Sequence, residues 1–242
     1  MRTLVIGDIH GGLLALKEVL KKAKVNQNDT LIFLGDYVDG WSQSAETIRY
    51  LIDLKKEINC IFIRGNHDEL LYNYLKHGQD IDTWRIHGGN ESIKSYKKIT
   101  KKEREIHLTF LENLKFYHID SLNRLFVHGG FSSHRGPEYE YYKHMVYWDR
   151  SLWETACALN PNLSIKDVRY PNRLKLFNEI FIGHTPVTRI GKNVPVCFGN
   201  VWNIDTGAAF KGPLTILDAK SKEYWQSTPV YLLYPEEIGR NK

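Results

Sequence analysis

Polar side chains that can bind a metal ion follow five short apolar runs along the chain. Each run leads into glycine beside Asp, His or Asn, in the segments Gly7-Asp8-Ile9-His10-Gly11, Gly35-Asp36-Tyr37-Val38-Asp39-Gly40, Gly65-Asn66-His67-Asp68, His128-Gly129-Gly130 and Gly183-His184-Thr185-Pro186. Carboxylate and amide oxygens suit Mg²⁺ or Mn²⁺, and imidazole adds affinity for Mn²⁺, Fe or Zn²⁺. The set therefore predicts a site for divalent metal ions.

Spacing and order extend this prediction to two ions. Asp8 and His10 are two residues apart, so an extended segment projects both from the same side. A single carboxylate, Asp36, could bridge two ions, and two metals about 3.5–4 Å apart can stabilise the attacking and leaving oxygens of an in-line phosphoryl displacement. Any one of these residues could instead form a turn or cap a helix. Five clusters in order, all at strand ends, favour a shared site.

The tripeptide His-Gly-Gly occurs twice, and we predict that only one copy binds metal. His128 ends a full strand pattern over residues 123–127, whereas His87 follows only three residues, 84–86, without such a pattern. We therefore predict that His128 is a ligand and that His87 is a structural residue.

The elements that must position these turns alternate between strands and helices. Apolar runs at 4–6, 31–34 and 61–63 are about 30 residues apart with helical patterns between them, which indicates βαβ units and a buried parallel sheet. Residues 70–115 are predicted to be helical, 116–130 to return to strand, 172–177 to be helical, and short strands to dominate from 179 onward. Ligands of such sheets bind beyond the carboxyl ends of the strands. We expect one α/β domain over residues 1–242.

Composition excludes several classes of protein. The chain has 242 residues, of which 42% are hydrophobic and 25% charged, so extended disorder is not expected. No apolar run approaches the roughly 18–20 residues that span a bilayer, and no signal peptide pattern is present, which predicts a cytoplasmic protein without a membrane partner. Three cysteines build neither a disulfide framework nor a metal clip. The net charge of +5 could attract anionic substrates but does not predict nucleic acid binding.

Taken in order, GDIHG, GDYVDG, GNHD, HGG and GHTP resemble the metallophosphatase signature of the phosphoprotein phosphatase superfamily, whose members are calcineurin-like phosphoesterases. The likeness is to the bacterial and phage branch, which includes phage-lambda-type serine/threonine phosphatases and symmetrical diadenosine tetraphosphatases. Trp84-Arg85-Ile86-His87-Gly88-Gly89-Asn90 and Asn203-Ile204-Asp205-Thr206-Gly207 resemble accessory segments of that branch. The resemblance implies an α/β fold, a sandwich of two mixed sheets flanked by helices.

The resemblance also implies a role for each matched residue. The first metal would be held by Asp8, His10 and Asp36, and the second by Asp36, Asn66, His128 and His184. His67 would be the general acid that protonates the leaving alkoxide, and Asp39 would orient it. The cofactors would be two divalent metal ions, with Mn favoured and Fe, Zn or Mg as alternatives, which supply the nucleophile by activating water.

The chain departs from the family pattern where an arginine usually grips the substrate phosphate. That position, directly after Asp39, is Gly40 in this chain, and Asp68 stands where protein phosphatases commonly have Glu. An arginine restored at position 40 should strengthen the binding of a phosphomonoester, provided that the backbone there does not have a positive φ that would strain it.

A second phosphate-binding arginine of the branch lies near a W-x-R segment, which Trp148-Asp149-Arg150 matches. We predict that Arg150, together with Asn66, binds the substrate phosphate; a surface ion pair with Asp149 or Glu154 is the alternative. The aromatic tract 139–148 could wall the cleft and stack on a base or a peptide side chain. We favour a helix that covers the edge of a sheet.

These observations predict a metal-dependent phosphoester hydrolase. The first choice is a phosphomonoesterase of the serine/threonine protein phosphatase type, which acts on a phosphorylated protein. The alternative is a hydrolase of dinucleoside polyphosphates or similar nucleotides. A third reading, a phosphate-binding module without catalysis, is opposed by the presence of His67 beside the complete ligand set.

Overall fold

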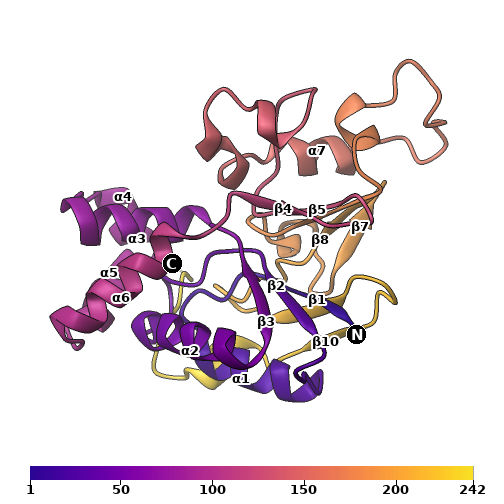
Figure 1. The fold of residues 1–242 in the computed structure, drawn as a ribbon. Helices are drawn as coiled ribbons and strands as arrows, with labels where there is room; N and C mark the ends of the chain where they lie inside the picture. Colours follow the sequence, from indigo (N-terminus) through magenta and orange to yellow (C-terminus); the bar gives the residue numbers. More distant parts are fainter. Residues whose placement is uncertain (242) are drawn as a thin grey trace.

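The computed structural model describes residues 1–241 and contains two five-stranded sheets that pack face to face (Figure 1). In the first sheet the order is β10-β9-β1-β2-β3, with β1 (Thr3–Ile6), β2 (Thr30–Phe33), β3 (Asn59–Phe62), β9 (Thr215–Asp218) and β10 (Tyr224–Gln226). In the second the order is β4-β5-β6-β8-β7, with β4 (Tyr117–Ile119), β5 (Arg124–Val127), β6 (Glu179–Ile182), β7 (Val196–Phe198) and β8 (Val201–Asn203). The predicted sandwich of two mixed sheets is confirmed.

Each sheet contains three adjacent parallel strands, which include the edge strand β3 in the first sheet and lie at the centre of the second. Strands β1, β2 and β3 pair in parallel in the first sheet, as do β5, β6 and β8 in the second, while the remaining strands pair antiparallel. The carboxyl ends of the two parallel sets meet at one edge of the sandwich, because Asp8 after β1 accepts a hydrogen bond from the backbone N–H of His184 after β6. This edge is the position expected for a ligand site.

Alternation along the strands sorts the apolar side chains into layers. In β1, Leu4 and Ile6 pack with the helices outside the first sheet, whereas Val5 belongs to the cluster between the two sheets. In that inner layer the rings of Phe126 and Phe181 stack with centroids 4.9 Å apart. Packing on both faces holds the strands, and therefore the turns at their ends, in fixed positions.

The helices lie outside the two sheets (Figure 1). On the first sheet are α1 (Leu13–Lys22) and α2 (Ser44–Glu57), and a neighbouring group comprises α3 (Asn66–His77), α4 (Asp82–Trp84), the π-helical turn η1 (Arg85–Gly89), α5 (Asn90–Tyr96) and α6 (Lys101–Glu112). On the second sheet is α7 (Ser151–Cys157), and α8 (Val230–Leu233) packs near α1. The remaining turns are 3₁₀ helices: η2 (Pro137–Tyr139), η3 (Lys143–Tyr147), η4 (Asn172–Lys175) and η5 (Val187–Ile190). Within residues 1–241, no helix combines the length and apolar character needed to cross a bilayer.

The aromatic tract 139–148 does not form the helix expected from its sequence. The 3₁₀ turn η2 ends at the first residue of the tract and η3 lies within the tract; Tyr141 and Tyr142 are exposed, whereas Tyr147 is buried. Gly136, directly before η2, has a φ of +112°, and tyrosine, histidine and tryptophan are weak helix formers. Trp148 at its end faces His184, with ring centroids 6.3 Å apart, so part of the tract reaches the site instead of covering a sheet edge.

Candidate active site

The six residues that the sequence singled out as metal ligands come together where the two sheets meet. We call them the strand-end cluster: Asp8, His10, Asp36, Asn66, His128 and His184. They follow β1, β2, β3, β5 and β6, and each side chain is at most 7% exposed. The structure thus brings into one buried cluster residues that are up to 176 positions apart in sequence.

The turns that carry this cluster are interlocked and strained. The backbone N–H groups of Ile9 and His10 both donate to the carbonyl oxygen of Asp36, at 3.0 and 2.8 Å. His10, Asp36 and His184 have φ values of 52°, 52° and 67°, which cost non-glycine residues about 1–2 kcal/mol each. Gly183 is required for close approach, since a β carbon there would lie 2.1 Å from Oδ1 of Asp8. Such strain persists only where the surrounding structure enforces it, and it is common at functional sites.

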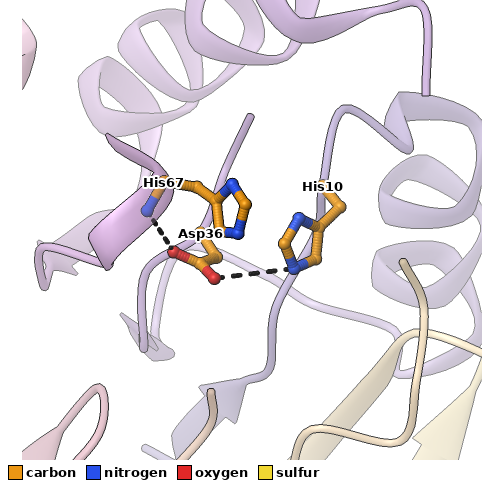
Figure 2. Close-up of side chains that lie close together, drawn as sticks. All are labelled: His10, Asp36 and His67. Carbon is orange, nitrogen blue, oxygen red and sulfur yellow. Dashed lines mark hydrogen bonds and ion pairs between the residues drawn. The ribbon is translucent and has the colours of Figure 1, made fainter. Parts of the chain in front are cut away.

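Asp36 is shared by two groups of possible ligands. On one side, its Oδ2 lies 3.5 Å from Nε2 of His10, and its Oδ1 accepts the backbone N–H of His67 at 3.0 Å (Figure 2). On the other side, its Oδ1 lies 3.4 Å from Nε2 of His128. The ligand atoms of His10, Asp36 and His67 lie within 4.8 Å of one another, as do those of Asp36, His128 and His184. Asp8 adjoins the first group, with Oδ2 4.0 Å from Nε2 of His10.

Backbone carbonyls orient two of the imidazoles. Nδ1 of His128 donates to the carbonyl oxygen of Leu34 at 2.8 Å, and Nδ1 of His10 donates to that of Asp39 at 3.2 Å. A proton held on Nδ1 leaves Nε2 as the lone-pair nitrogen. In both rings this nitrogen faces the strand-end cluster, which is the outer hydrogen bonding typical of metal-bound histidine.

The residues present fit divalent cations. Oδ1 of Asp8 and Nε2 of His184 are buried without a hydrogen-bond partner among the described residues, so both are available as ligands. Burial lowers the pKa of His128, but the charges of Asp36 and Asp8 outweigh this effect and raise that pKa to about 9. The same carboxylates attract a cation, and a metal ion at Nε2 would displace the proton there. The mixture of oxygen and imidazole donors suits divalent metals.

The predicted acid and its partner form a separate pair beside the cluster. Nδ1 of His67 lies 2.6 Å from Oδ2 of Asp39, whose side chain is fully buried. The same carboxylate accepts hydrogen bonds from Nε1 of Trp84 at 2.6 Å and from Oγ of Ser92 at 2.5 Å. Sequence reasoning missed the roles of Trp84 and Ser92, although Trp84 opens the accessory segment resembling the phosphatase branch.

Two further aspartates complete the buried network. Asp68, one of the two departures from the family pattern, accepts backbone N–H groups of Asp36 and Tyr37 at 2.8 and 2.9 Å, so it joins the turns after β2 and β3.

Asp205 follows β8, the sixth parallel strand end, and burial raises its pKa to about 6. The sequence analysis used Asp205 only as part of a motif; its position after an apolar strand was the signal for a site residue.

A cavity of about 570 Å³ opens over the cluster, within the usual range for a small-molecule site. Three arginines from separate segments line it, and we call them the arginine wall: Arg150, Arg189 and Arg240. Trp148 and Phe210 also line the cavity. His87, predicted to be structural and not a metal ligand, lies outside both groups of possible ligands and is an exposed residue of the cavity lining.

Two sequence expectations about phosphate-binding arginines, the alternative for Arg150 and the substitution at Gly40, can be compared with the structure. Among the described residues, Arg150 forms no ion pair with Asp149 or Glu154 within 4.0 Å. Asp149 instead accepts hydrogen bonds from the hydroxyl of Ser151 and the backbone N–H of Leu152. Gly40 has a φ of +104°, and a β carbon there would lie 3.3 Å from Cγ of Arg240. An arginine at position 40 would therefore strain the backbone and crowd Arg240, so the condition set for the expected gain in binding is not met.

Comparisons with known proteins agree with this site. The profile of the calcineurin-like phosphoesterase family matches residues 1–206. The asymmetrical bis(5'-nucleosyl)-tetraphosphatase PrpE of Oceanobacillus iheyensis is 26% identical over 93% of this chain and 91% of its own length. Its counterpart in Bacillus velezensis is 29% identical over 87% of this chain and 86% of its own length. A solved structure provisionally named a diadenosine tetraphosphatase superposes with a TM-score of 0.63 at 19% identity, covering 93% of this chain and 92% of that one.

Proposed function

Because this chain belongs to the calcineurin-like phosphoesterase family, and is thus a phosphoester hydrolase, we propose that its substrate is a dinucleoside tetraphosphate. The observation that carries this choice is the arginine wall above the strand-end cluster. Three guanidinium groups exceed what one phosphomonoester dianion requires, whereas a tetraphosphate bridge carries several negative charges along its length. The names of the full-length relatives favour the same alternative over a protein phosphatase.

The strand-end cluster would hold two divalent metal ions. Asp8, His10 and Asp36 would bind the first, and Asp36 with Asn66, His128 and His184 the second. Ions bound there would draw charge from phosphate oxygens and lower the pKa of water toward neutrality. The mixed oxygen and nitrogen donors favour Mn²⁺, with Fe, Zn²⁺ or Mg²⁺ as alternatives.

The cavity lining would position the nucleotide. Arg150 and Asn66 would hold the phosphate that reacts, and Arg189 would reach the rest of the phosphate chain. The ring of Trp148 stands edge-on to His184 and is 39% exposed, so it offers a surface on which a base could stack.

His67 would donate a proton to the leaving group. Asp39 fixes Nδ1 of His67 at 2.6 Å, so the donor is Nε2. In the reaction, water adds to one phosphorus atom, the bond from that phosphorus to the bridging oxygen breaks, and the bridging oxygen leaves with the neighbouring phosphate. Asymmetrical cleavage would give one nucleoside triphosphate and one nucleoside monophosphate.

One assay separates this substrate from a phosphoprotein. Purified protein loaded with Mn²⁺ is given diadenosine tetraphosphate or a phosphoserine peptide, and the products are resolved by chromatography. We expect kcat/KM for the tetraphosphate to exceed that for the peptide by at least about tenfold, a difference of about 1.4 kcal/mol. ATP and AMP in equal amounts are the expected products. A preference for the peptide would refute the proposal, and two molecules of ADP would refute the asymmetry.

The buried Asp39–His67 pair favours a second candidate, hydrolysis of phosphomonoesters. An alkoxide is a poor leaving group and needs a proton donor more than a phosphate leaving group does. The assay above therefore includes the phosphoserine peptide as a competing substrate.

A further inference from the structure

We propose that Arg240, in the segment after α8, binds the phosphate chain of the substrate and replaces the arginine that is missing at position 40. This inference rests on the proposed nucleotide substrate, but it concerns a residue that no motif in the sequence identified. The segment comprises residues 234–241, and we call it the tail.

The side chain of Arg240 occupies the space that Gly40 leaves open. Its Cγ and Cδ lie 3.3 and 3.6 Å from where a β carbon of Gly40 would stand. Its guanidinium carbon lies 5.3 Å from the centre of the Phe210 ring, and both residues line the same cavity as His10 and His67. An arginine from the tail thus reaches the region directly beside the turn that carries Asp36 and Asp39.

Specific contacts hold the tail in this position. The backbone N–H of Arg240 donates to the carbonyl oxygen of Ala209 at 2.9 Å. Glu237 accepts the backbone N–H of Ser42 at 2.9 Å and its hydroxyl at 2.6 Å. The bonds of Glu237 connect the tail to Ser42, which follows the strand-end turn of β2, so the loop that lacks the usual arginine helps to hold the tail.

The residue after Gly40 contributes to the same arrangement. Trp41 is fully buried, stacks on Tyr234 with centroids 5.3 Å apart, and donates from Nε1 to the carbonyl oxygen of Ala208 at 2.8 Å. Gly239, with a φ of 57°, passes so close to Trp41 that a β carbon would lie 2.7 Å from its ring. Gly40 makes room for the Arg240 side chain, and Trp41 makes the surface on which the tail packs.

The guanidinium of Arg240 is available to an anion. Its Nε is buried without a hydrogen-bond partner among the described residues, as is Nε of Arg150 on the same cavity. A buried donor without a partner is costly, and a phosphate oxygen would relieve that cost. The contact with the Phe210 ring holds the planar guanidinium in place. Its N–H groups remain free to donate two parallel hydrogen bonds to a phosphate.

The test compares two substitutions at this position with a matched control. Arg240→Met keeps most of the aliphatic side chain and removes the charge. Arg240→Lys keeps a positive charge but cannot donate two parallel hydrogen bonds as a guanidinium does. Arg169→Met is the control, because Arg169 is exposed, pairs with Asp167 at 2.8 Å and lies outside the cavity lining. Calorimetry of the metal-free protein with tripolyphosphate measures binding without turnover, and KM and kcat are then measured for diadenosine tetraphosphate. Melting temperatures are recorded for every variant.

We expect Arg240→Met to weaken tripolyphosphate binding by about 10- to 100-fold, the range typical for a charge-assisted hydrogen bond. KM for the tetraphosphate should rise in the same variant, and Arg240→Lys should recover part of the lost affinity. The affinity and KM of Arg169→Met should stay within about twofold of the parent values, the range of a typical surface substitution. Binding by Arg240→Met equal to that of the parent would overturn the inference. An equal loss in both Arg240 variants with a lower melting temperature would also overturn it, in favour of a structural role. If the parent binds tripolyphosphate through Arg240 but does not cleave the tetraphosphate, the proposed function fails and this inference stands.

Discussion

The strand-end cluster and the arginine wall face the same cavity but are built in different ways. Every member of the cluster is at most 7% exposed and sits on a turn fixed by strands that are packed on both faces. The arginine wall comes from three segments outside the sheets: the start of α7, the short turn η5 and the tail. Arg189 is exposed, and Arg150 and Arg240 are half-buried.

Under the proposed function, this difference assigns the chemistry to the cluster and the recognition of the substrate to the wall. Moving a buried member of the cluster disturbs several hydrogen bonds and charges at once, because Asp36 alone contacts His10, His67 and His128. A residue of the wall can change with little effect on the packed core. If the proposed roles hold, substitutions in the wall would change which phosphate compound binds, while the cluster would keep the same reaction.

Substitution of Asp36 should have the largest effect, because this residue belongs to both groups of ligands. We expect Asp36→Asn to reduce bound metal and to bring hydrolysis of p-nitrophenyl phosphate below detection, as chelation of the parent should also do. Elemental analysis and the activity assay measure this. Asp53→Asn, on the exposed face of α2, is the control. If Asp36→Asn keeps its full metal content and activity, the proposed role of the strand-end cluster in hydrolysis is wrong.

His67→Ala should have the next largest effect and should leave metal content unchanged. General acid catalysis contributes about 10²–10⁴-fold, so kcat for a phosphoserine peptide should fall within that range. The loss should be smaller for p-nitrophenyl phosphate, whose leaving group needs little protonation. His77→Ala, at the exposed end of the same helix, is the control. Equal losses on both substrates would assign His67 a positional role.

Arg150→Ala should weaken substrate binding while the cluster remains intact. A charge-assisted hydrogen bond of about 1.5–3 kcal/mol corresponds to a loss of about 10- to 150-fold in kcat/KM. The matched control is Arg135→Ala, an exposed arginine that stacks on Tyr139. If kcat/KM of Arg150→Ala stays within twofold of the parent while metal is bound, Arg150 does not bind the substrate phosphate.

Glu237→Gln should have the smallest effect, because Glu237 only positions the tail. Glutamine keeps one acceptor for Ser42 and loses the charge, so we expect KM for diadenosine tetraphosphate to rise about two- to fivefold, the cost of roughly half to one kcal/mol in a neutral hydrogen bond. The value of kcat should not change. Glu236→Gln, its exposed neighbour, is the control. A change in kcat without a change in KM would contradict a positioning role.

The strands that carry the site could be predicted from local pattern, whereas the sandwich of two sheets was expected only from the family resemblance. Apolar runs followed by glycine and polar residues identified β1, β2, β3, β5 and β6, because each strand and its turn are contiguous in sequence. The helix expected over 139–148 was wrong, since its apolar residues reflect contacts with other segments and not a helical face. Asp205 was also overlooked, for a different reason. Its motif was recognised, but the strand before it was not counted among the parallel strands.

The sequence by itself determined the members of the strand-end cluster that we propose as ligands, and the family to which the chain belongs. Both depend on short motifs whose residues stay together whatever the rest of the chain does. Only the tertiary structure decided that Trp84 and Ser92 hold Asp39 and that Arg189 and Arg240 join Arg150 over the cavity. Arg240 is 200 positions from Gly40, and no local pattern links an open space at a glycine to the distant side chain that fills it. Packing alone brings the two together.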